Sequence, residues 1–256
     1  MLDIRSERNK KTFIDNKKTL ACYILAGYPD EEKFFDVLEI CSFSQFDILE
    51  IGFPSHNPYL DGSVIADAHS KVNKEVCTSL EYWRRIRENT DKPIWLMGYY
   101  EDLVKDDIYK TLYREKLIDA LVIPDISNQE RERLSLETKG SSFDIVGFTN
   151  PNMSKEELTL VFETFPIVYE QLYVGQTGAV NEKEMYHPML ELSKKYPDKY
   201  GLAGFGISRK DQVEKLYSEG FEGAIIGTGI VRHLNESLSS MKYYMEDLGG
   251  AKEKWR

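Results

Sequence analysis

Cysteine is scarce in this chain, and the few cysteines form no recognisable pattern. The 256 residues include only Cys22, Cys41 and Cys77, an odd number without CxxC spacing. Such a set favours a reducing compartment over a secreted domain held together by disulfides. Four scattered histidines likewise lack the spacing of metal ligands, so we expect neither a metal site nor a disulfide framework.

Long apolar runs and an excess of positive charge are also lacking. No apolar stretch approaches the roughly 20 residues that span a membrane, and the charged segment 1–18 has no apolar core typical of a secretory signal. The formal net charge of −10 argues against general affinity for nucleic acid or anionic membranes. We therefore expect a cytoplasmic protein that holds any phosphate through local features such as backbone N–H groups.

No low-complexity stretch or linker divides the chain, so we interpret 1–256 as one domain. Short apolar runs without alternation, typical of parallel strands buried on both faces, recur eight times, at 19–25, 46–52, 93–99, 119–125, 143–148, 166–172, 200–206 and 222–228. Right-handed crossovers between eight such strands lead to a closed barrel or a doubly wound sheet, and the eightfold count favours the barrel. The fold class is thus predicted as a single (β/α)8 TIM barrel, with extended loops after strands 2 and 6.

Amphipathic segments separate the predicted strands. The segment 34–41 has apolar residues at three- and four-residue steps, as a helix requires. Ser127 with Glu130, and Ser154 with Glu157, have the spacing of a capping box and predict helix starts.

Two carboxylates are candidates for catalysis. Glu50 lies near the end of the second predicted strand, where a partly desolvated site would raise its pKa and suit it to general acid chemistry. The alternative is a buried acid paired with a neighbouring base. Asp61 lies in the following loop, where Asp-Gly alone would indicate only a turn. Because that loop returns over the same barrel mouth, the two carboxylates could divide the acid and base roles.

Glycine-rich segments follow the last strands. GFGIS (204–208) follows strand 7 and IIGTGI (225–230) follows strand 8, the two positions where barrels often bind phosphate. Each motif alone is weak, but together they favour a phosphorylated substrate. GQTGAV (175–180) after strand 6 is typical of a lid, or of an ordinary surface loop.

At this point the sequence resembles the tryptophan synthase α-subunit family. Segment 49–68, LEIGFPSHNPYLDGSVIADA, is similar to the family's L-E-[LIV]-G-x-P-F-S-D-P-x-A-D-G-P signature, and segment 202–231 to its GFGIS…G-A-x-x-G-[ST]-[AG]-[IL]-V. YILAGYPD (23–30), LMGYY (96–100) and VIPDI (122–126) match shorter motifs in order. The resemblance therefore covers nearly the whole chain.

The resemblance implies a retro-aldol cleavage of indole-3-glycerol phosphate to indole and glyceraldehyde 3-phosphate, without metal or organic cofactor. Glu50 matches the family's general acid/base, Asp61 the carboxylate that binds the indole N–H, and Tyr169 an active-site tyrosine. Thr177 matches the lid threonine. The implied phosphate contacts are Gly178, Gly206, Gly227 and Thr228. The implied indole-pocket residues are Tyr23, Met97, Tyr99 and Phe205.

Departures from the family pattern concern the loop after strand 2 and the lid. Ser55, His56 and Asn57 stand where the family has Phe-Ser-Asp, and Tyr173 stands where the lid normally carries an Arg; the other changes are Leu60 for Ala and Ser63 for Pro. The lost Asp belongs to the family's contact surface for the pyridoxal-phosphate β subunit. These changes therefore bear on the association with a β subunit more than on the cleavage reaction.

Three interpretations stay open at this point. The first is an α subunit that works with a β subunit. The second is an independent indole-releasing lyase, or a lyase for a modified indole phosphate. The third is a catalytically weakened protein that mainly activates a β subunit. The presence of both Glu50 and Asp61 argues against this third interpretation. His56 is a further candidate proton donor near the site, although a single loop histidine is more often a surface residue.

Overall fold

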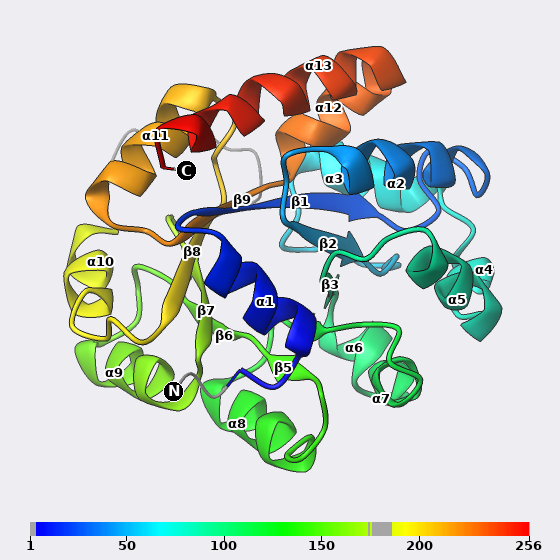
Figure 1. The fold of residues 1–256 in the computed structure, drawn as a ribbon. Helices are drawn as coiled ribbons and strands as arrows, with labels where there is room; N and C mark the ends of the chain where they lie inside the picture. The colour runs from blue at the N-terminus through cyan, green and yellow to red at the C-terminus, as the bar shows by residue number, and fades with distance from the viewer. Residues whose placement is uncertain (1–3, 174, 176–185, 256) are drawn as a thin grey trace.

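The described part of the chain curls into a nearly closed barrel of parallel strands (Figure 1). The structure is a computed structural model and describes residues 4–173, 175 and 186–255. Among these residues the sheet order is β5-β4-β3-β2-β1-β9-β8-β7-β6. The strands are β1 (Thr19–Leu25), β2 (Ile48–Gly52), β3 (Ile94–Met97), β4 (Ala120–Val122), β5 (Asp144–Ile145), β6 (Gly147–Thr149), β7 (Ile167–Gln171), β8 (Tyr200–Gly204) and β9 (Gly223–Ile226).

The eight predicted strands are confirmed in place, but the fifth is split. Residues 143–148 were expected to form one strand, whereas β5 and β6 are separated by Val146. β5 pairs only with β4 and β6 only with β7, while the Val146 N–H donates to the carbonyl of Leu121 at 3.0 Å. Strands in a barrel are staggered, so one strand can pair with one neighbour along its first half and with the other neighbour along its second half. This stagger explains the split. The sheet therefore closes through this segment, and the doubly wound alternative is wrong.

Helices surround the strands (Figure 1). Their bounds are α1 (Glu7–Asp15), α2 (Lys33–Phe43), α3 (Ser63–Lys71), α4 (Lys74–Cys77), α5 (Leu80–Glu88), α6 (Tyr100–Leu103), α7 (Ile108–Arg114), α8 (Asn128–Glu137), α9 (Lys155–Thr164), α10 (His187–Ser193), α11 (Lys210–Glu219), α12 (Thr228–Glu236), α13 (Leu238–Gly249) and the 3₁₀ segment η1 (Gly250–Trp255). The predicted helix starts are confirmed: Ser127 caps α8, and Ser154 with Glu157 forms a capping box on α9.

The connections after the second and sixth predicted strands are long, as expected. Residues 53–62 form a loop between β2 and α3, and α4 and α5 follow before β3. Residues 172–186 lie between β7 and α10, and most of them are outside the described part. No helix among the described residues is long and apolar enough to cross a membrane.

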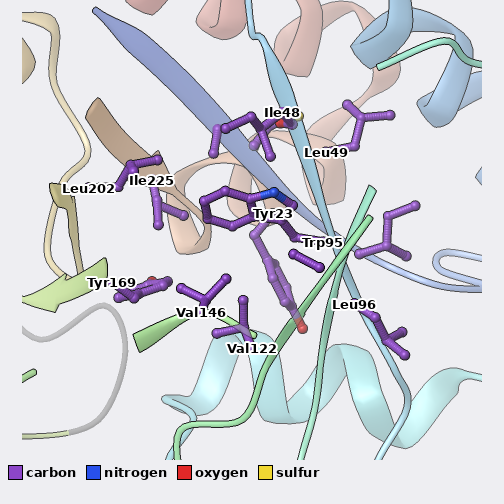
Figure 2. Close-up of a cluster of buried hydrophobic side chains, with 14 of the residues drawn as sticks. Tyr23, Ile48, Leu49, Trp95, Leu96, Val122, Val146, Tyr169, Leu202 and Ile225 are labelled. Atoms are coloured by element: carbon purple, nitrogen blue, oxygen red, sulfur yellow. Dashed lines mark hydrogen bonds between the residues drawn. The ribbon is translucent and has the colours of Figure 1, made fainter. Parts of the chain in front are cut away.

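Side chains that point inward from the strands fill the barrel. Paired residues of parallel strands point to the same side of the sheet, and the register pairs Tyr23 with Glu50 and Glu50 with Trp95. Figure 2 shows Tyr23 and Trp95 gathered between the strands, while Leu49 points away from this interior. The interior is therefore a packed core in which Glu50 is an unusual polar member.

Helix α1 closes the amino-terminal end of the barrel. Asn9 donates to Asp144 at the start of β5 (2.9 Å) and accepts from the indole N–H of Trp95 in β3 (2.9 Å). Phe13 stacks on Tyr200 at the start of β8, with ring centroids 4.1 Å apart. Because Trp95 in β3 and Tyr200 in β8 lie on opposite sides of the barrel, α1 spans its amino-terminal end.

The Asn9→Ala variant should unfold more easily than the wild type. The substitution leaves the buried Trp95 N–H without its acceptor, a loss of about 1–3 kcal/mol in the free energy of unfolding. Lys11→Ala, an exposed change in the same helix, should cost about 0.5 kcal/mol or less. Denaturant titration of both variants measures the difference; equal stabilities would contradict the role given to α1.

Candidate active site

A cavity opens at the carboxyl ends of the strands. Nine of the residues predicted for the site line it together: Tyr23, Glu50, Asp61, Met97, Tyr169, Phe205, Gly206, Gly227 and Thr228. Six further residues complete the wall, of which four belong to the predicted glycine-rich segments 204–208 and 225–230: Ile65, Ile207, Ser208, Ile225, Gly229 and Arg232. Thr177 and Gly178 lie outside the described residues.

Glu50 is carried into the cavity by β2 and is almost fully buried, with 1% of its surface exposed. Its Oε1 atom has no hydrogen-bond partner among the described residues. Burial raises the pKa of Glu50 from 4.5 to about 8, and the negative charge of Asp61 adds to the rise. The buried carboxyl is therefore protonated near neutral pH, as a general acid must be.

Asp61 faces Glu50 from the loop 53–62. A turn holds its backbone, because the Asp61 N–H donates to the carbonyl of Pro58 at 3.0 Å. The Tyr99 hydroxyl donates to Asp61 Oδ2 at 2.7 Å. Tyr99 was expected in the indole pocket, but it is not among the described residues that line the cavity. The structure instead places it behind Asp61, as a hydrogen-bond donor to the carboxylate.

Two tyrosines lie in the cavity because glycines on the next strand make room for them. A Cβ atom at Gly52 would overlap the Tyr23 ring, and one at Gly204 would overlap the Tyr169 ring. In both pairs the glycine lies two residues beyond the strand partner of the tyrosine, so each ring leans toward the barrel mouth. Burial, followed by the charges of the nearby carboxylates, raises the pKa of both phenols well above 10, which keeps them protonated.

The opposite end of the cavity is formed by the loops after β8 and β9. Phe205 and Gly206 both have positive φ, 70° and 75°, and for Phe205 this conformation is strained. Gly227 is the N-cap residue of α12, and it has no side chain that could accept hydrogen bonds from the first N–H groups of the helix. Gly227 and the first residues of α12 line the cavity. Such an amino terminus suits an anion.

Arg232 was missed by the sequence analysis although it lines the cavity. It lies four residues after Thr228 in α12, so both side chains are on the same face of the helix. That spacing, counted from Thr228 in the predicted glycine-rich segment 225–230, is the signal that could have identified it. The cavity thus has carboxyl groups at one end and a cation with a helix amino terminus at the other.

None of the residues that depart from the family pattern is among the described residues that line this cavity. His56 is exposed and lines a surface groove with Ser55 and His69, outside the cavity, which does not support its role as a proton donor. Tyr173 packs over Gly206, close enough to overlap a Cβ atom there. Among the described residues no group of three or more His, Cys, Asp or Glu side chains is arranged to hold a metal ion.

Glu170 provides an internal comparison for Glu50. It is also fully buried, and burial likewise raises its pKa to about 8. However, it alternates with Tyr169 along β7 and accepts a hydrogen bond from Ser193 at 2.9 Å, so its carboxyl points toward α10. A raised pKa alone therefore does not identify the site, whereas orientation into the cavity separates Glu50 from Glu170.

The fold and the cavity define a (β/α)8-barrel protein whose site pairs a buried acid with a second carboxylate. Mycobacterium tuberculosis tryptophan synthase has this fold, with a TM-score of 0.83 and 21% identity over 96% of this chain and 98% of that chain. The tryptophan synthase α-subunit of Pyrococcus furiosus superposes with a TM-score of 0.79 and 21% identity, over 92% and 99% of the two chains.

The sequence comparisons identify the family. The tryptophan synthase alpha chain of Aquifex aeolicus (strain VF5) is 31% identical over 245 residues, which cover 91% of this chain and 90% of the relative. That of Arabidopsis thaliana is 28% identical over 250 residues, with 92% and 90% coverage. The family model "Tryptophan synthase alpha chain" matches residues 10–254. The chain therefore belongs to the tryptophan synthase alpha chain family, and membership implies a lyase role in tryptophan synthesis.

The contribution of Glu50 and of Glu170 to the stability of the wild type should decrease as the pH rises from 4.5 to about 8. In this window the unfolded chain ionises Glu50 and Glu170 while the folded chain keeps them protonated, so protons are lost on unfolding. Glu50→Gln and Glu170→Gln cannot titrate, and each should gain stability relative to the wild type as the pH rises. Denaturant titrations at both ends of the window test this; a pH-independent difference would contradict the raised pKa values.

Proposed function

We propose that the chain is a lyase that cleaves indole-3-glycerol phosphate to indole and glyceraldehyde 3-phosphate. The observation that carries this proposal is the orientation of Glu50, a protonated and buried carboxyl that faces Asp61 across a cavity with an anion-binding end. A retro-aldol cleavage of this substrate needs a proton donor, a negative charge and a phosphate site, and the cavity offers a candidate for each.

In the proposed reaction Glu50 transfers its proton to C3 of the indole ring. The ring then carries a positive charge, which the Asp61 carboxylate stabilises at the ring N–H. The Glu50 carboxylate next removes the proton of the hydroxyl on the carbon attached to the ring. That oxygen forms the aldehyde as the carbon–carbon bond breaks, and the bonding electrons return to the ring. Glu50 ends the cycle protonated.

The remaining cavity residues bind the two ends of the substrate. The aromatic rings of Tyr23, Tyr169 and Phe205 supply an apolar pocket for the indole. The loop at Gly206 and the amino terminus of α12 receive the phosphate, beside the guanidinium of Arg232. The substrate thus extends between the carboxyl groups and the anion-binding end.

We keep the β subunit as the partner of this chain and the cytoplasm as its location. The exposed loop residues His56 and Asn57 replace part of the family's contact surface for the β subunit. These two substitutions therefore bear on the affinity of this chain for that partner. The three cysteines are free and buried, which agrees with a reducing compartment.

Indole release from indole-3-glycerol phosphate, with and without a tryptophan synthase β subunit, tests the proposal. Slow release that accelerates with the β subunit is the expected result for an α subunit. Fast release by the isolated chain would instead identify an independent lyase. Absence of release under both conditions would reject the proposed substrate.

Glu50→Gln should lower kcat by about 10²–10⁴ because the amide cannot transfer the proton, while KM changes little. Glu170→Gln is the matched control, since it removes an equally buried carboxyl that points away from the cavity, and it should keep the wild-type rate. Steady-state kinetics compares the two variants. Equal losses in both would show that burial, not proton transfer, explains the effect.

Arg232→Gln should raise KM by about fivefold, because an exposed cation contributes only about 1 kcal/mol to phosphate binding. Since the phosphate is bound equally in the ground and transition states, kcat should stay near the wild-type value. Arg209→Gln is the control, as Arg209 is paired with Asp211 and does not line the cavity. An unchanged KM in Arg232→Gln would remove Arg232 from the phosphate site.

A further inference from the structure

His69 lies directly behind Asp61. It is carried by α3, two turns after Asp61, and only 3% of its surface is exposed. Its Nε2 atom is 3.7 Å from Asp61 Oδ2, the oxygen that also accepts the Tyr99 hydroxyl. His69 does not line the main cavity, but it shares a small adjoining cavity with Asp61 and Tyr99. It can therefore act on a substrate only through Asp61.

The hydrogen bonding of His69 assigns its proton. The backbone N–H of Ser55 donates to Nδ1 at 2.9 Å. In a neutral imidazole the accepting nitrogen carries no proton, so the proton is on Nε2. Burial, with a smaller effect of the Lys74 charge, lowers the pKa of His69 to about 4, which keeps the ring neutral. An Nε2–H group therefore lies beside the Asp61 carboxylate.

The Nε2–H group has no other partner among the described residues. A distance of 3.7 Å exceeds a normal hydrogen bond, but hydrogen bonds between catalytic groups are often long without ligand and shorten in the complex. A buried donor without a hydrogen-bond partner carries a free-energy penalty, and a hydrogen bond from His69 Nε2–H to Asp61 would remove it. Ser55, whose backbone N–H donates to His69, stands at a position where the family has Phe.

We infer that His69 is a positioning residue for Asp61: Ser55 fixes the imidazole, whose Nε2–H orients the carboxylate toward the cavity together with the Tyr99 hydroxyl. This role rests on the proposed function of Asp61, and it adds a group that acts behind the carboxylate. The His69 Nε2–H and the Tyr99 hydroxyl then fix the orientation of the Asp61 carboxylate before the reaction. In this orientation the carboxylate can stabilise the positive charge that develops on the indole ring.

Two substitutions of His69 separate this role from simple packing. In His69→Asn the amide oxygen can replace Nδ1 as acceptor for Ser55, but no donor reaches Asp61. In His69→Gln the amide nitrogen can replace Nε2 and donate to Asp61, while the contact with Ser55 is lost. We expect His69→Asn to lower kcat by roughly 10- to 100-fold and His69→Gln to stay near the wild-type value. His187→Asn, an exposed change, is the control.

A double-mutant cycle with Asp61→Asn shows whether the effect passes through Asp61. In the Asp61→Asn background, His69→Asn should cause no further loss of kcat. Equal rates for the Asn and Gln variants of His69, a loss confined to Gln, or additive losses in the cycle would each overturn the inference. Variants are compared only after denaturant titration shows that they fold.

The tautomer of His69 is tested independently of activity. Long-range ¹H–¹⁵N NMR of the wild type should show the proton on Nε2, and a proton on Nδ1 would overturn the inference. If the wild type does not cleave indole-3-glycerol phosphate, the proposed function fails, whereas the NMR measurement still decides the His69 contact. The two failures are therefore distinguishable.

Discussion

The burial of the Glu50 carboxyl is the constraint on which the proposed chemistry depends. Parallel strands covered by helices place β2 in an apolar interior, and α1 closes the barrel end below it through Asn9. Under these conditions the neutral form of the carboxyl is favoured, and a residue that is normally ionised at pH 7 can donate a proton.

Orientation, rather than burial alone, turns this carboxyl into a candidate catalyst. Glu170 shares the burial and the raised pKa of Glu50 but faces Ser193 and α10. Asp61 differs from both because it lies in a loop, where it accepts a hydrogen bond from Tyr99. The barrel thus combines a neutral acid on a rigid strand with a loop carboxylate that accepts a hydrogen bond from behind. Such a division suits a reaction in which a proton is transferred and a positive charge develops.

Much of this arrangement could be predicted from sequence because it depends on short-range patterns. Apolar runs indicated the strands, and the Gly-rich segments indicated the loops after the last two. The split at Val146 could not be predicted, since it depends on which neighbour each half of the strand meets in the closed sheet. The positions of Tyr99 and His69 beside Asp61 could not be predicted for a related reason: these contacts join chain segments whose distance only the fold determines.

The protonation state of Glu50 can be measured directly by ¹³C NMR titration of the glutamate carboxyl groups. Glu50→Gln and Glu170→Gln assign the two buried resonances by their disappearance. The resonance lost in Glu50→Gln should titrate near pH 8. A midpoint near 4.5 would mean that Glu50 is ionised at neutral pH, and it would contradict its role as the proton donor.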